Sequence, residues 1–209
     1  MKNLFLAGMI CLSFVSFTKA QTLSPSVGIK GGVNFTNLYT EDVDDNNVLT
    51  SFNAGLFVNL PVSSAASIQP ELNFSRKGSE LVYDNAFATG TTRLKLNYLE
   101  MPVLLKLNLT PNLNIHFGPY VAYLIDGKAT NESNDGTFNF EDNISNDDLN
   151  KWDYGLSGGV GFDFGSTSLG IRYNYGLQTI GKERTFGGST YTFPDSKNSA
   201  LSMYIGFKL

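Results

Sequence analysis

The sequence predicts an all-β fold: an eight-stranded antiparallel up-and-down transmembrane β-barrel with short periplasmic turns and long extracellular loops. From Val27 onwards, apolar and polar residues alternate with a period of two almost everywhere, which is typical of strands with two different faces. Short and long connections between these strands alternate strictly, as in a meander that closes into a barrel. The polar face carries glycines and full charges, whereas the apolar face is aromatic near its ends. We therefore expect the apolar face to point outwards, towards lipid.

The first twenty residues have the pattern of a secretory signal peptide. Lys2 precedes an apolar run over residues 4–17, and small residues come before a predicted cleavage site after Ala20. The run is shorter than the roughly 20 residues that a membrane-spanning helix needs. We assign residues 1–20 to a signal peptide and residues 21–209 to one outer-membrane β-barrel domain.

Removal of this leader would change the cysteine content and the charge of the chain. Cys11, the only cysteine, lies inside the leader, so disulfide bonds are not expected to stabilise the mature protein. The leader also contains two lysines and no acidic residue, so its loss takes the formal charge from −4 to −6. Such an acidic chain is not expected to bind nucleic acid.

Eight segments show the alternation that predicts strands. They cover residues 26–35, 51–60, 67–75, 93–109, 112–124, 152–164, 168–177 and 200–209. The fourth segment changes register near Tyr98 and Leu99, as a β-bulge would make it do. Short turns follow the second, fourth and sixth segments, and the long links cover residues 36–50, 76–92, 125–151 and 178–199. Both ends of the barrel chain should therefore lie at the tight-turn end.

The polar face carries charges in the middle of its strands. A single buried charge is costly, so these residues are expected to pair across neighbouring strands. An eight-stranded barrel has an interior that side chains just fill, which favours a structural plug of ion pairs over a proton or ion path. The predicted interior charge network consists of Lys30, Glu71, Glu100, Lys106 and Arg172.

The apolar face has aromatic residues near both ends of the strands. Two aromatic girdles around an aliphatic band are typical of a membrane-spanning surface. The alternative is a soluble lipocalin-like carrier, in which the apolar face would point inwards. The predicted aromatic girdle consists of Phe35, Phe52, Phe74, Tyr98, Tyr123, Trp152, Tyr154 and Tyr175 at the long-loop end, and of Phe162, Phe164 and Phe207 near the tight-turn end.

We expect no catalytic, cofactor-binding or metal site. His116 is the only histidine and lies near the tight-turn end, away from the outer rim where a catalytic set could be assembled, so we interpret it as an interior side chain with satisfied hydrogen bonds. The glycine-rich run over residues 155–165 is not followed by a helix and is not a phosphate loop. Residues 131–142 resemble a calcium loop only loosely, and a solvated acidic loop is the expected reading.

Five short motifs occur in order along the whole mature chain. They are Gly28-x-Lys30-Gly31-Gly32-x-Asn34-Phe35, Gln69-Pro70-Glu71-Leu72 with Lys77-Gly78, Asn97-Tyr98-Leu99-Glu100-Met101-Pro102 with Lys106, Gly118-Pro119-Tyr120, and Arg172-Tyr173-x-Tyr175-Gly176. With these motifs the chain resembles the PorT-like outer-membrane β-barrel proteins of Bacteroidetes. The resemblance implies an integral barrel of the cell outer membrane in a Gram-negative bacterium, in a family whose members mostly lack an assigned activity. PorT itself is linked to type IX secretion.

The last ten residues, ALSMYIGFKL, alternate up to the C-terminus and are expected to form the closing strand of the barrel. They resemble the terminal signal by which a barrel is recognised by its insertion machinery, with Phe207 as the aromatic residue. The outward residues of the predicted closing strand are Leu201, Met203, Ile205, Phe207 and Leu209.

The expected function is a structural or interaction barrel without enzymatic activity, and the alternative is a narrow channel or secretion-associated component. The expected partners are outer-membrane lipid, the barrel insertion machinery and an unknown surface or envelope protein.

Overall fold

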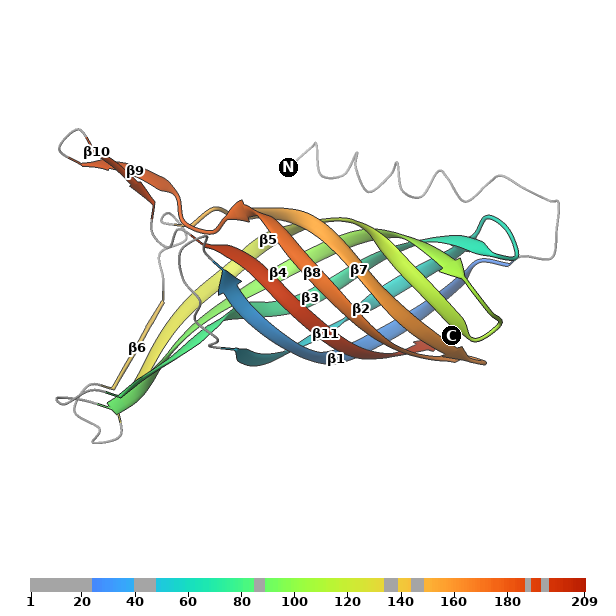
Figure 1. The fold of residues 1–209 in the computed structure, drawn as a ribbon, viewed down its shortest axis with the longest axis horizontal. Helices are drawn as coiled ribbons and strands as arrows, with labels where there is room; N and C mark the ends of the chain where they lie inside the picture. Colours follow the sequence, from blue (N-terminus) through green and yellow to red (C-terminus); the bar gives the residue numbers. More distant parts are fainter. Residues whose placement is uncertain are drawn as a thin grey trace.

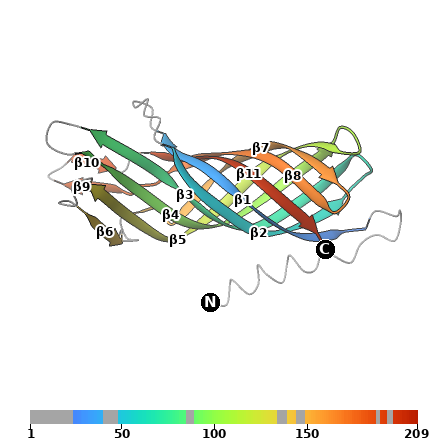
Figure 2. The ribbon, with the colours of Figure 1, turned by 90° about the horizontal axis from the view of Figure 1, so that it is seen from below.

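A computed structural model shows eight long antiparallel strands that form a closed ring, as the sequence predicts (Figures 1 and 2). The ring strands are β1 (Ser26–Tyr39), β2 (Leu49–Pro61), β3 (Ala66–Asp84), β4 (Thr89–Asn108), β5 (Leu113–Ser133), β7 (Trp152–Phe164), β8 (Thr167–Thr179) and β11 (Lys197–Lys208). Three short strands lie outside the ring: β6 (Phe140–Asn143), β9 (Glu183–Phe186) and β10 (Ser189–Thr192). The structure describes residues 24–39, 48–84, 89–133, 139–143, 149–186, 189–192 and 196–209, and the predicted leader lies outside them.

The ring closes between its first and last strands. Each strand pairs with its neighbour in the order β1, β2, β3, β4, β5, β7, β8 and β11, and β11 then pairs with β1. This last pairing runs from Gly28 opposite Lys208 to Tyr39 opposite Lys197. Because the ring is complete, none of the eight strands is left as an open edge over the height of the barrel. The closing pair also places the C-terminus at the tight-turn end (Figure 1).

Alternate side chains point into the ring and away from it. In β11, Leu201, Met203, Ile205 and Phe207 are exposed, whereas Ser202 between them is buried. The same arrangement holds around the ring, so that the inside is polar and the outside is apolar. A soluble barrel would have the opposite arrangement. No helix in the described part of the chain is long and apolar enough to cross a membrane.

Much of the predicted long loops consists of strand. β3 and β4 continue through the expected link 76–92 and stay paired from Arg76 opposite Asn97 to Asp84 opposite Thr89. β5 extends to Ser133 and pairs with β6. These extensions stand beyond the rest of the ring (Figure 1). Outside a membrane both faces of a strand meet water, so the alternation that marks a strand in the sequence is absent there.

The predicted bulge is not in the fourth segment but in its neighbour. β4 and β5 pair as Asn97 with Asp126 and then as Tyr98 with Leu124, so the extra residue is Ile125 on β5. β4 itself keeps one alternation, since Leu96, Tyr98 and Glu100 are all buried. Tyr98 therefore points into the barrel, where it is 1% exposed. Its assignment to the outer aromatic girdle is therefore wrong.

Candidate functional site: the filled barrel interior

The first interior cluster is centred on Glu71 of β3. Its carboxylate accepts hydrogen bonds from Lys30 Nζ at 2.7 Å and from Arg172 at 2.7 Å (Nη1) and 2.9 Å (Nη2). All three side chains are buried. Gln69 and Asn73 donate further hydrogen bonds to the same carboxylate. These donors satisfy the hydrogen-bonding capacity of the buried carboxylate. The cluster therefore holds β1, β3 and β8 together across the lumen.

The second cluster lies nearer the long-loop end. Lys77 Nζ is 2.6 Å from Glu100 and 3.4 Å from Asp153, and none of the three is more than 3% exposed. The ammonium group also lies over the rings of Tyr120 and Tyr98, at 4.3 and 5.4 Å from their centroids. These aromatic faces compensate part of the desolvation of the lysine.

The third cluster lies at the tight-turn end. Lys106 Nζ is 2.7 Å from Asp163, and Lys208 is 4.0 Å from the other oxygen of the same carboxylate. The five residues of the predicted network therefore fall into three separate clusters. Lys77, Asp153 and Asp163, which complete these clusters, were not identified as site residues. For Asp153 and Asp163 the available signal was their position on the polar face of segment 152–164, whereas Lys77 lies in the predicted link 76–92 and had no such signal.

The middle of the barrel has almost no free volume. Two cavities among these side chains hold only about 10 Å³ each, which is space for one water molecule at most. A wider polar vestibule of about 360 Å³ opens at the tight-turn end, between the turns and Lys106. The lumen is thus blocked above this vestibule.

An apolar cluster closes the long-loop end of the lumen. Leu149 and Ile180, both outside the ring strands, pack with Leu96 and Leu124 in one buried group. Asn150 holds the two segments together, because its backbone N–H donates to the carbonyl of Ile180 at 2.8 Å. Water therefore meets an apolar lid before it reaches the ion pairs.

His116 is buried among polar groups and has only one of its two ring nitrogens hydrogen-bonded. Nδ1 lies 3.2 Å from the side-chain oxygen of Asn114, and the ring meets Tyr204 edge-on. Nε2 has no hydrogen-bond partner among the described residues. The contacts of the ring are an amide and a phenol, which do not form a nucleophile–histidine–carboxylate set.

The structure contains no group of acidic, histidine or cysteine side chains that could hold a metal ion, within the residues it describes. Asn131 and Ser133, the first residues of the loose calcium-loop pattern, belong to β5. The oxygen of Asn131 accepts a hydrogen bond from Thr92 at 2.7 Å. The residues at 135 and 136, and the acidic run at 41–47, lie outside the described part of the chain.

Ten of the eleven predicted girdle residues have exposed or half-buried side chains on the outer face. Trp152 and Tyr123 meet edge to face at 5.0 Å between ring centroids, and Phe52 stacks on Phe74 at 5.7 Å. Their role at a membrane interface stays a prediction. Tyr98 is the exception described above.

Comparison with known proteins identifies the kind of barrel. The sequence matches the family described as outer membrane protein beta-barrel domain over residues 19–181. A search of curated proteins gives no match. Ail of Yersinia pestis, solved in complex with the heparin analogue sucrose octasulfate, is 10% identical and has a TM-score of 0.50, and the match covers 89% of this chain and 99% of that one. Neisserial surface protein A is 11% identical with a TM-score of 0.49, and the match covers 89% and 99%.

The family match, together with the polar interior and the apolar outer face, places the protein in the cell outer membrane. The matched residues include most of the ring strands, from β1 to β8. This chain belongs to the outer membrane protein beta-barrel domain family.

Proposed function

We propose that this protein is an occluded outer-membrane anchor, without enzymatic activity, that presents a strand-based platform to a protein partner outside the membrane. The observation that carries the proposal is the contact between Arg172 and Glu71, which spans the lumen between opposite strands of the ring. A second contact across the ring joins Asn198 of β11 to the hydroxyl of Tyr98 on β4 at 3.2 Å. Side chains that meet across the lumen leave no continuous path for solutes.

The strand extensions supply the platform. β3, β4, β5 and β6 continue side by side beyond the barrel, and ion pairs link them. The guanidinium of Arg93 forms ion pairs with Glu80 and with Glu132. Hydrogen bonds to these two carboxylates raise the pKa of the guanidinium above its usual value. Strands joined in this way keep a fixed shape, which favours recognition of a partner without a large ordering cost.

The charge of this platform suggests which partners it suits. Ail has been solved with a sulfated heparin analogue, and a polyanion of that kind is attracted by free cationic groups. Here Arg93 and Lys128, two of the cations on these strands, are already engaged by acidic neighbours. With its acidic outer segments and a formal charge of −6 once the predicted leader is removed, the chain instead suits a partner with a basic surface.

The alternative function is a narrow channel or a secretion-associated component, as the PorT-like resemblance implies. Conduction would require Arg172 to leave Glu71 and the apolar lid at Leu149 to move. The vestibule at the tight-turn end is the feature that favours this alternative, since it admits solutes as far as Lys106.

A planar-bilayer recording with purified protein tests occlusion. We expect no stable open-channel current from the native chain. The double variant Glu71→Ala with Arg172→Ala should raise the current, because it removes the contact across the lumen. The double variant Glu80→Ala with Arg93→Ala removes an ion pair outside the barrel and should behave like the native protein. Large and stable currents from the native chain would contradict the proposal.

A pull-down from native outer membranes tests the platform. We expect a reproducible protein partner that the variant Glu80→Lys with Glu132→Lys no longer captures, because the variant reverses the charge around Arg93. An interior variant, Lys106→Met, should still capture it. If the charge-reversal variant captures the same partner as the native chain, the acidic platform is not the binding surface.

A further inference from the structure

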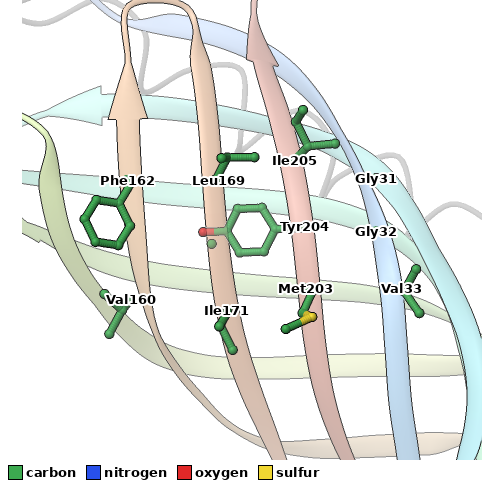
Figure 3. Close-up of a pocket in the computed structure, with 11 residues that line it drawn as sticks. Gly31, Gly32, Val33, Val160, Phe162, Leu169, Ile171, Met203, Tyr204 and Ile205 are labelled. Carbon is green, nitrogen blue, oxygen red and sulfur yellow. The ribbon is translucent and has the colours of Figure 1, made fainter.

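The two faces of the barrel wall differ in the chemistry they offer. The outer face has a hollow of about 570 Å³ over β7, β8, β11 and β1, lined by residues such as Phe162 and Leu169 (Figure 3). No charged side chain lines it. Reactive groups are gathered in the lumen instead, where the second interior cluster brings Lys77, Glu100 and Asp153 together.

This second cluster combines one amine with two carboxylates. The other two clusters each have one carboxylate and two cations. An amine and a carboxyl group can condense into an amide, and a second carboxylate beside them can carry the proton that this reaction has to move. The second cluster therefore contains more groups than an ion pair requires, and they are of the types that amide formation needs.

The surroundings of Lys77 favour its neutral, nucleophilic form. None of the three side chains in the cluster is more than 3% exposed. The Nζ atom lies over the rings of Tyr98 and Tyr120, which belong to the same buried apolar group as the lid at the long-loop end. Burial disfavours both the ammonium and the carboxylate form, and proton transfer from Nζ to Asp153 leaves a neutral amine beside a neutral acid.

Asp153 is arranged as the group that is attacked. Its Oδ2 atom accepts hydrogen bonds from Asn198 Nδ2 at 3.0 Å and from the hydroxyl of Tyr120 at 3.3 Å. These two donors stabilise the negative charge that develops on Oδ2 when a nucleophile adds to Cγ. Oδ1 is buried and has no hydrogen-bond partner among the described residues, so it is the oxygen that can take a proton and leave.

Glu100 is positioned to carry the proton. Its Oε2 atom is 2.6 Å from Lys77 Nζ, and its Oε1 atom accepts a hydrogen bond from Asn174 at 3.1 Å. A fixed carboxylate at this distance can take a proton from Nζ and return it to the departing oxygen. A cavity of about 10 Å³ that Glu100 lines has room for one released water molecule.

We propose that Lys77 and Asp153 condense into an intramolecular amide bond. The bond from Nζ to Cγ forms, the bond from Cγ to Oδ1 breaks, and the hydroxyl of the acid leaves as water with one proton from Nζ. Glu100 carries that proton and ends unchanged, so no oxidant or cofactor is consumed. Lys77 Nζ is already 3.4 Å from Oδ2, which is bonded to Cγ, so the strands do not have to move.

The bond ties two strands that are not neighbours. Lys77 lies on β3 and Asp153 on β7, with β4 and β5 between these strands in the ring. The link crosses the lumen directly beneath the apolar lid, at a level where ion pairs alone would otherwise join the two sides. The inference goes beyond the proposed function, because the bond forms whether or not the barrel has a protein partner.

Intact-mass spectrometry of the folded native protein tests the bond. We expect the mass to be lower than that of the sequence by one water molecule, and tandem spectra of a digest to contain a branched peptide that joins Lys77 to Asp153. Glu100→Gln keeps both reacting groups and should lower the rate of water loss by about 100-fold or more, the usual contribution of a proton-transfer group. Glu80→Gln is the matched control, since it makes the same substitution in an ion pair outside the barrel, and it should retain the bond.

The native chain itself protects the test against misfolded variants. Chain that has been kept unfolded in urea should have its full mass and should lose water only after it folds into detergent, as followed by heat-modifiable gel mobility. Folded native protein with the full mass would overturn the proposal. Water loss that the digest locates elsewhere in the chain, or equal rates of water loss in folded native protein and folded Glu100→Gln, would also overturn it.

Discussion

Arg172 and Glu71 are 101 positions apart in the chain and meet in the centre of the barrel, with 2.7 Å between Nη1 and Oε2. Their strands, β8 and β3, lie on opposite sides of the ring. The pair can therefore form only when the ring is closed, and it couples the correct pairing of all eight strands to the burial of two charges. Lys30 on β1 completes the same cluster beside the closing strand.

Removal of Glu71 should strongly destabilise the barrel. In Glu71→Ala, the cations Lys30 and Arg172 remain buried without their shared partner, and breaking a buried pair typically costs about 3–5 kcal/mol. Urea unfolding in lipid vesicles, followed by heat-modifiable gel mobility, measures this loss. Glu80→Gln affects a half-buried pair outside the barrel and should change the free energy of unfolding by about 0.2–1 kcal/mol. Equal effects of the two variants would argue against a structural role of the central cluster.

Tyr98 should contribute to stability from inside the barrel. Tyr98→Phe removes the acceptor for Asn198 and should lower the free energy of unfolding by about 0.5–1.5 kcal/mol. The matched control is Tyr123→Phe, on the outer face, where a change within about 0.5 kcal/mol is expected. The same unfolding assay applies. An unchanged free energy of unfolding in Tyr98→Phe would show that the hydrogen bond to the Tyr98 hydroxyl does not contribute to stability.

The strands inside the membrane could be predicted because their two faces meet different solvents. Lipid outside and packed polar groups inside force an alternation that is visible in segments such as 152–164 and 200–209. Beyond Gly78 on β3 and before Leu94 on β4, the described side chains are half-buried or exposed on both faces and carry no such signal. They were expected to be loops for this reason.

The partners of the interior charges were harder to predict than the charges themselves. Which residues meet across a barrel depends on the strand stagger, and alternation does not give the stagger. Glu100 was correctly expected to lie on the polar face, but its partner Lys77 lies in the third strand beyond the predicted segment 67–75. Tyr98 was misplaced because the bulge was assigned to the fourth segment, whereas the extra residue, Ile125, is on the neighbouring strand β5.

Gly32 should be essential for ring closure, whereas the neighbouring Gly31 should not. An added Cβ at Gly32 would collide with the backbone of Met203 and Tyr204 on the closing strand. Gly32→Ala should therefore destabilise the barrel by about 1–3 kcal/mol through overpacking. In Gly31→Ala the added Cβ makes only ordinary van der Waals contact. This variant should leave the free energy of unfolding unchanged or raise it by up to about 1 kcal/mol. Gel mobility and urea unfolding of the two single variants separate these outcomes, and equal stability of the two would contradict the close approach of β1 and β11.

The pairing of β6 with β5 should weaken in acid. The hydrogen bond from Lys128 keeps the pKa of the Glu141 carboxyl below its ordinary value of 4.5. Because the pKa of Glu141 is lower in the folded than in the unfolded state, its ionised carboxylate stabilises this pairing above pH 4.5. The stabilisation is lost as the pH falls through the pKa of the folded state. Amide hydrogen exchange of residues 140–143 should therefore accelerate in acid. In Lys128→Ala the pKa of Glu141, followed by NMR, should rise towards 4.5. An unchanged pKa would show that the ion pair is not formed in solution.

Deletion of residues 205–209 should abolish insertion into the outer membrane. The deletion removes the pairs from Gly28 opposite Lys208 to Gly31 opposite Ile205, and it also removes the end of the pairing between β11 and β8. The tight-turn end of the ring then has two open edges, whose unpaired backbone groups are costly in lipid. Membrane fractionation and heat-modifiable mobility measure the outcome. Deletion of Leu209 alone removes one backbone hydrogen bond, to Val27, and leaves β11 intact, so this control should still insert. Normal assembly of the chain that lacks residues 205–209 would show that insertion does not require the pairing between the ends of β1 and β11.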